Sequence, residues 1–162
     1  MFNQHTLDIP IGNKTLTLET GKVARQANGS IVISCGETVL LATACASTTV
    51  APEIDFLPLR VDYQEKFSSV GRTAAGFIKR EGRPAEREVL ISRLIDRPLR
   101  PMFEEGYYNE IQILTFTLSY DLHHQPDVLA ICGASFCRIT RLVPFITGCL
   151  NSYNTCPRML IS

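Results

Sequence analysis

The stretch PAEREVLISRLIDRPLRP, residues 84–101, reads as an amphipathic helix with a defined start and a defined end. Pro84 suits the first turn of a helix, and the two glutamates that follow it suit the positive end of the helix dipole. Pro98 and Pro101 oppose regular continuation of the helix. Between these limits, apolar side chains recur at helical spacing and are expected to face the core: Leu90, Ile91, Leu94 and Ile95.

Strand signals lie on both sides of this helix. Polar and apolar residues alternate with a period of two, as in residues 15–18, which indicates half-buried strands. Turns that contain glycine, such as residues 35–37, separate runs of β-branched residues. The expected elements are a hairpin at 5–20, a hairpin at 30–44, strands at 57–66 and 111–119, and a second helix from 126 toward 135.

Length and composition fit one globular domain. The chain has 162 residues, of which 45% are hydrophobic and 20% are charged, close to the globular average. It has no run of about 18 apolar residues, and its first residues form neither a basic leader nor an apolar signal segment. We therefore expect a cytoplasmic protein without membrane contact, in which the six cysteines are thiols. The cysteines and histidines lack the spacing of a zinc site, so no metal site is expected.

Positive charge is concentrated in residues 72–100, although the chain as a whole carries no net charge. This stretch holds eight basic and four acidic residues and so carries +4, whereas each flank carries −2. A patch of this kind attracts an anionic polymer or a phosphate. The residues leave a second interpretation open, in which the arginines form a solvated network with neighbouring glutamates.

The types of residue in this stretch suit a nucleic acid. Arg93 and Arg97 are one helical turn apart and share a face, with Arg100 close behind. Guanidinium groups bind phosphate oxygens through two parallel hydrogen bonds and stay charged at physiological pH. Phe77, beside two basic residues, offers an aromatic face on which a base can stack.

Groups for bond-breaking chemistry are not evident. Asp55, Asp62 and Asp96 form no close carboxylate pair, and no Ser/His/Asp or Cys/His arrangement is apparent. His123 and His124 are interpreted as part of a solvated turn.

Three blocks of sequence resemble the first ribonuclease PH-like core domain of the bacterial polynucleotide phosphorylases. They are DFLPLRVDYQEKF at 55–67, GFIKREGRPAERE at 76–88 and RLIDRPLRPMF at 93–103. Two further blocks, ETGKVARQA at 19–27 and PDVLAICGAS at 126–135, extend the resemblance over residues 5–135. The resemblance implies an α+β ribonuclease PH-like fold, with a mixed sheet packed against helices and incomplete at the C-terminus.

The resemblance also implies a function. Members of this family degrade RNA from its 3′ end by phosphorolysis: inorganic phosphate attacks the terminal phosphodiester and nucleoside diphosphates are released. The reverse reaction polymerises them with Mg²⁺. The resemblance further implies a homotrimeric ring with a central channel for single-stranded RNA, and partners in RNA degradation.

The residues that the resemblance assigns to RNA binding all lie in the basic stretch. Residues 77–80 match a family loop that grips RNA in the channel, although Ile78 replaces a second phenylalanine and Lys79 replaces an arginine. Arg93, Arg97 and Arg100 match family arginines that are needed for RNA handling. The implied RNA-binding residues are Phe77, Lys79, Arg80, Arg83, Arg93, Arg97 and Arg100.

The resemblance places the phosphate-binding loop and the catalytic and metal-binding carboxylates of the family in a second core domain, which this sequence does not contain. We therefore expect residues 1–135 to form a partial first domain without catalytic or metal-binding residues, inactive by itself. Residues 136–162 lack Asp and Glu, hold half of the cysteines and show no periodicity. We interpret them as an irregular tail that arose by a frameshift.

Three alternatives stay open. The chain could be a single-stranded RNA-binding fragment without chemistry, or a fragment that folds poorly because sheet edges and apolar faces stay uncovered. It could also be a ribonuclease PH-type tRNA-processing enzyme, although residues 76–84 resemble the polynucleotide phosphorylase version of the loop.

Overall fold

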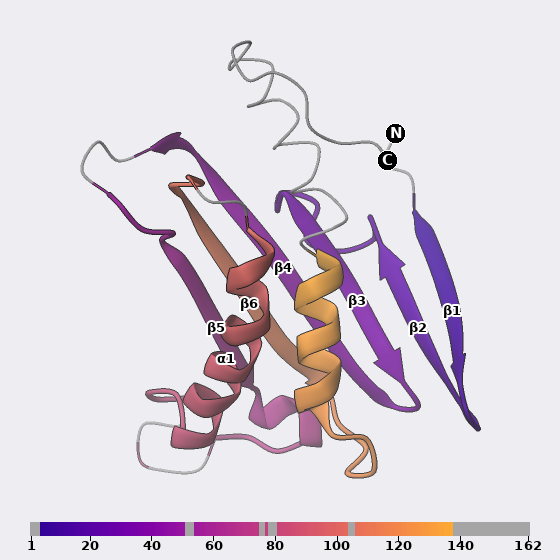
Figure 1. The fold of residues 1–162 in the computed structure, drawn as a ribbon. Helices are drawn as coiled ribbons and strands as arrows, with labels where there is room; N and C mark the ends of the chain where they lie inside the picture. The colour runs from indigo at the N-terminus through magenta and orange to yellow at the C-terminus, as the bar shows by residue number, and fades with distance from the viewer. Residues whose placement is uncertain (1–3, 51–53, 75–76, 78–80, 104–105, 138–162) are drawn as a thin grey trace.

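One six-stranded mixed sheet forms the frame of the structure, with its strands in the order β1-β2-β3-β4-β6-β5 (Figure 1). The computed structural model describes residues 4–50, 54–74, 77, 81–103 and 106–137. The strands are β1 (His5–Ile11), β2 (Lys14–Thr20), β3 (Gly29–Cys35), β4 (Thr38–Val50), β5 (Leu59–Glu65) and β6 (Asn109–Ser119). The predicted α+β class with a mixed sheet is confirmed.

Two glycine turns build the first four strands into antiparallel hairpins. β1 pairs with β2, and β3 pairs with β4, each across a two-residue connection. The first residue of each connection, Gly12 or Gly36, has a φ of +62°, which L-residues with a side chain rarely adopt. At Gly36 a Cβ atom would also lie 2.8 Å from the His124 ring. Both hairpins expected from the sequence are therefore present.

The last two strands form a parallel pair that sequence periodicity does not reveal. β5 is an edge strand and runs parallel to β6, whereas β6 runs antiparallel to its other neighbour, β4. A parallel pair needs a long crossover, because both strands must run in the same direction. The helix α1 (Glu86–Leu99) lies in this crossover, so the basic stretch belongs to the connection that leads from β5 to β6.

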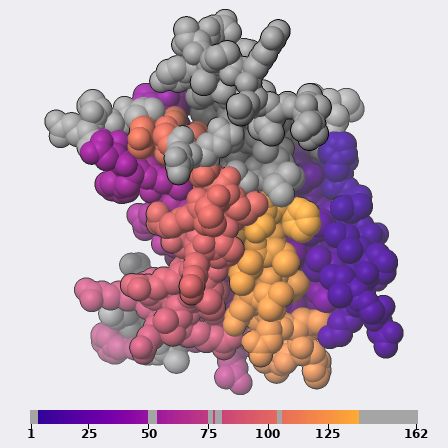
Figure 2. All heavy atoms as spheres, viewed as in Figure 1, coloured from indigo at the N-terminus to yellow at the C-terminus, as the bar shows by residue number. Residues whose placement is uncertain are grey.

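Both long helices cover the same face of the sheet (Figure 1). They are α1 and the helix formed by residues 126–137. Arg87 of α1 and Asp127 of the second helix form an ion pair at 3.3 Å, and Figure 2 shows the two helices side by side. Short 3₁₀ segments, η1 (Phe67–Val70) and η2 (Arg100–Met102), lie before and after α1. The core lies between the sheet and the helices, and its fully buried members include Ile33, Leu40, Tyr63, Ile95, Leu99, Ile111 and Ile113.

The buried stripe of α1 is narrower than the sequence predicts. Ile91, Ile95 and Leu99 are buried, at intervals of four residues. Leu90 and Leu94, which we expect in the core, are 58% and 54% exposed. Each residue turns a helix by about 100°, so these leucines lie on a flank of α1 that the sheet does not reach.

Pro98 lies inside α1 rather than beyond its end. It stands in the last turn, where its missing N–H removes a single helical hydrogen bond. Two residues later the helical bonding pattern is present again, because the backbone N–H of Arg100 donates to the Asp96 carbonyl. The chain then tightens into η2 rather than leaving the helix at Pro98.

The second helix continues beyond the predicted domain boundary. Residues 136 and 137 are helical, although we expect the irregular tail to begin at 136. Cys137 is fully buried, and burial raises the pKa of its thiol to about 12. The rest of the predicted tail, residues 138–162, lies outside the described residues, so the frameshift stays a prediction. None of the described helices is long and apolar enough to span a bilayer.

Candidate nucleic-acid interface

Arg93 and Arg97 lie on the outer side of α1. The inner side of the helix is fixed by burial of Ile91 and Ile95 against the sheet. Arg93 and Arg97 are both exposed, and residues four apart share a helical face. The two arginines therefore share a helical face, as predicted, and the structure shows that this face is open to solvent.

Arg100 differs from these two arginines, because its guanidinium group forms hydrogen bonds within the chain although the residue is exposed. Its Nε donates to Asp96 Oδ2 at 2.7 Å, and its two terminal nitrogens lie 3.5 Å and 3.3 Å from the carbonyl oxygens of Leu57 and Leu59. The guanidinium group thus joins the C-terminal end of α1 to the start of β5. The other oxygen of Asp96 is buried and has no hydrogen-bond partner among the described residues, so the ion pair with Arg100 compensates this carboxylate.

Two further side chains of α1 bind the outer edge of β5. The backbone N–H of Tyr63 donates to Ser92 Oγ at 3.0 Å, and the N–H of Glu65 donates to Glu88 Oε1 at 2.7 Å. Glu88 Oε2 also accepts the N–H of Ala85 at 2.6 Å, which caps the start of α1. These bonds satisfy edge N–H groups of β5. They also fix the rotation of α1, and with it the direction of Arg93 and Arg97.

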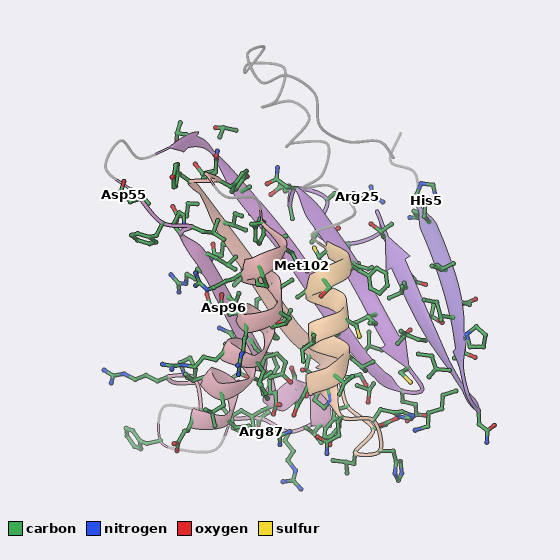
Figure 3. The ribbon with its side chains drawn as sticks, viewed as in Figure 1. His5, Arg25, Asp55, Arg87, Asp96 and Met102 are labelled. Atoms are coloured by element: carbon green, nitrogen blue, oxygen red, sulfur yellow. The ribbon has the colours of Figure 1, made fainter. Side chains whose placement is uncertain are left out.

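Arg93 and Arg100 line a groove of about 300 Å³ between α1 and β5. Asp62 and Asp96 also line it, and each binds an arginine: Arg60 Nε lies 2.8 Å from Asp62 Oδ2. Asp96 lies in the last turn of α1, whereas Arg87 lies in its first turn (Figure 3). The carboxylates of the groove are therefore partly neutralised by the protein itself.

The segment before α1 carries the remaining predicted residues. Phe77 is fully exposed, as a stacking platform must be, and Arg83 is exposed. Lys79 and Arg80 lie outside the described residues. Glu81 anchors this segment: it binds Lys66 Nζ at 2.8 Å and accepts the Phe67 N–H at 3.0 Å. Both bonds lower the pKa of its carboxyl group, with Lys66 as the larger cause.

The structure also brings together polar residues that are distant in the sequence. Thr38 Oγ1 donates to Asp121 Oδ1 at 2.9 Å. Asp121 Oδ1 also accepts the backbone N–H groups of His123 and His124, each at 2.8 Å. The His124 ring binds the other oxygen of Asp121. Burial alone raises the pKa of Asp121, but the N–H donors, the His124 ring and the Thr38 hydroxyl outweigh it and hold the pKa well below its usual range.

The prediction that both histidines lie in a solvated turn is therefore wrong for His124, whose side chain is only 18% exposed. The aspartate three residues before His124 is a local signal for such a turn. Thr38, 83 residues away from Asp121, has no signal in the sequence.

Comparison with known proteins identifies the family. The family model described as "3' exoribonuclease family, domain 1", RNase_PH, matches residues 12–137. The chain belongs to this 3′ exoribonuclease family. The matched residues include every strand from β2 to β6, α1 and the second helix.

Curated relatives in this family are named polyribonucleotide nucleotidyltransferase. The protein of that name from Protochlamydia amoebophila is 60% identical over 145 residues, which cover 90% of this chain and 21% of the relative. The one from Nitrobacter hamburgensis is 52% identical over 145 residues, covering 90% of this chain and 20% of the relative. The chain thus spans about a fifth of the length of these relatives.

Solved structures share the fold of this exoribonuclease domain. A chain of the Archaeoglobus fulgidus exosome "with RNA bound to the active site" superposes with a TM-score of 0.60 at 16% identity, covering 78% of this chain and 51% of that one. Rice Rrp46 superposes with a TM-score of 0.53 at 11% identity, covering 86% of this chain and 56% of that one. At such low identities the likeness shows the fold alone.

Proposed function

We propose that this sequence is the RNA-binding first core domain of a polyribonucleotide nucleotidyltransferase, which degrades RNA from 3′ to 5′ by phosphorolysis and releases nucleoside diphosphates. The names of the curated relatives support this activity for the whole protein. The observation that carries the RNA-binding role is the pair Arg93 and Arg97 on the outer side of α1, whose rotation is fixed by the bonds to β5.

Electrostatics and geometry support a strand of single-stranded RNA as the ligand. Two guanidinium groups one turn apart can bind neighbouring phosphates of one strand, and their charge does not depend on physiological pH. Phe77 supplies a stacking surface that tolerates any base. The full proposed set is Phe77, Lys79, Arg80, Arg83, Arg93, Arg97 and Arg100. Within this set Arg100 acts mainly by holding α1 to β5.

Inorganic phosphate and Mg²⁺ belong to the proposal for the whole protein. Across residues 4–50, 54–74, 77, 81–103 and 106–137, no three metal-ligating side chains gather. The groove carboxylates Asp62 and Asp96 bind Arg60 and Arg100, so this set does not fit a magnesium centre. We therefore derive no step through the metal from these residues, and we propose that the 162-residue chain alone does not carry out phosphorolysis.

The family resemblance supports the remaining parts of the proposal. They are a homotrimer with a channel for RNA, a cytoplasmic location, a role in mRNA degradation and contacts with other RNA-degradation proteins. The absence of phosphate-dependent release of nucleoside diphosphate from poly(A) is the expected result for the chain alone. Release that depends on added phosphate would overturn that part.

Binding of a fluorescently labelled oligoadenylate to the full 162-residue chain tests the RNA-binding role. Arg93→Ala and Arg97→Ala should each weaken binding several-fold, because each removes one charge-assisted phosphate contact. Lys14→Ala is the control, since it removes one positive charge from the β1–β2 end of the sheet, opposite to β5. Equal binding by all three variants would refute the assignment of the RNA contact to α1.

A further inference from the structure

A second groove, of about 560 Å³, lies at the carboxyl ends of the parallel strands β5 and β6. Glu65 and Thr117 contribute from these strands, and η1, residues 81–85 and the first turn of α1 form its walls. In Figure 1 this is the lower end of the two strands, beside η1. In open sheets with parallel strands, crevices outside the carboxyl ends of the strands are recurrent ligand sites. A volume of this size suits a small organic group.

Aromatic and other apolar side chains form part of the lining. Phe67 lines the groove and is 50% exposed, so a ligand can reach its ring. Tyr120 lines it from the end of β6, and its backbone N–H is fixed by a bond of 3.1 Å to the Ser69 carbonyl. Pro84 and Pro126 add rigid apolar surface. A flat heterocycle that enters this groove can therefore stack on an aromatic ring.

The charges of the lining favour a neutral ligand over a bare phosphate. Three cations and three carboxylates line the groove: Lys66, Arg83, Arg87, Glu65, Glu81 and Glu88. The carboxylates are already held in place, since Glu81 binds Lys66 and Glu88 accepts two backbone N–H groups. The groove thus carries no net charge, in contrast to the outer side of α1. Arg83 is exposed and forms no ion pair with a carboxylate of the described residues, so it can attract a phosphate.

We propose that this groove binds one nucleobase of the RNA strand, stacked on Phe67 and Tyr120, with the phosphate of that nucleotide on Arg83. The inference rests on the proposed function, because it assumes that RNA follows the basic stretch. Arg83 makes the groove continuous with that surface, since it lines the groove and lies three residues before the start of α1. The groove then accounts for binding of a base, and Arg93 and Arg97 account for binding of the backbone.

The test compares two labelled RNA hexamers with the full chain: hexa-adenylate, and a hexamer of the same charge that lacks all bases. Phe67→Ala should weaken binding of hexa-adenylate about fivefold or more, the effect of losing one stacked base. It should leave the abasic hexamer unchanged. Phe56→Ala is the matched control, because Phe56 is 67% exposed and precedes β5, at the opposite end of that strand. Circular dichroism melts verify that each variant folds, and Phe67→Leu replaces Phe67→Ala if that variant does not.

The outcomes separate this inference from the proposed function. Equal binding of hexa-adenylate by the parent and the Phe67 variant overturns the inference, as does an equal loss for both hexamers. If the parent binds neither hexamer, the RNA-binding proposal fails, and the groove is then tested alone with 2-aminopurine riboside at millimolar concentration. Quenching of its fluorescence by the parent, but not by the Phe67 variant, supports a base site. Equal fluorescence with both proteins overturns it.

Discussion

Arg97 lies in the last turn of α1, Arg100 follows directly at the start of η2, and both carry the same charge. The structure nevertheless predicts different consequences for their loss. Arg100→Ala should lower the free energy of unfolding by about 2 kcal/mol. Its bond to Asp96 is half-exposed and is worth about 0.5–1 kcal/mol. The long contacts to the carbonyls of Leu57 and Leu59 add about 0.5 kcal/mol each. The remaining loss comes from Asp96, whose buried oxygen then lies in an uncompensated carboxylate.

Arg97→Ala should change the free energy of unfolding by less than about 0.5 kcal/mol, as exposed substitutions do. Urea unfolding followed by circular dichroism measures both. With a slope of about 2 kcal/mol per molar urea, the midpoint falls by about 1 M for Arg100→Ala and stays nearly constant for Arg97→Ala. A double-mutant cycle with Asp96→Asn should show coupling to Arg100 and none to Arg97. Two arginine variants with equal midpoints would refute the clamp between α1 and β5.

Three further outcomes follow from the same contacts. Glu88→Ala should lower the free energy of unfolding by about 2–3 kcal/mol, because it removes a cap and a bond to β5, whereas its neighbour Glu86→Ala should cost under about 1 kcal/mol in the same urea experiment. Asp121→Asn should be less stable than the parent at pH 7. Because folding lowers the pKa of Asp121, the parent loses this stabilisation as the pH falls below about 4, and the difference in melting temperature between the two proteins should shrink. Thermal melts at a series of pH values measure this difference. Mass spectrometry of each cysteine after iodoacetamide at pH 8 should show slow alkylation at buried Cys137 and faster alkylation at exposed Cys45, and equal rates would contradict the burial.

The local features of the fold follow from the sequence. Gly12 and Gly36 mark the hairpin turns because only glycine adopts their backbone angles easily. Alternation predicts β5, and the helical period predicts α1, because each signal depends on residues within one element. The outward direction of Arg93 and Arg97 is predictable for the same reason.

Contacts between distant elements are not predictable in this way. Periodicity shows that Leu90 and Leu94 lie near the buried stripe of α1, but the width of the stripe depends on how far the sheet extends beneath the helix. The role of Arg100 depends on carbonyl groups more than 40 residues earlier, and charge patterning does not indicate which arginine finds a partner within the chain. The bond between Thr38 and Asp121 likewise depends on the strand order.

The salt dependence of RNA binding tests the central claim, that the outer side of α1 binds the phosphates of single-stranded RNA. The measurement is the slope of log affinity against log salt for oligoadenylate and the full chain. Each phosphate contact contributes about 0.7 to this slope for a single strand. The Arg93→Ala/Arg97→Ala double variant should therefore show a slope that is smaller by about 1.4, while Lys14→Ala keeps the parent slope. A double variant with the slope of the parent would contradict the account.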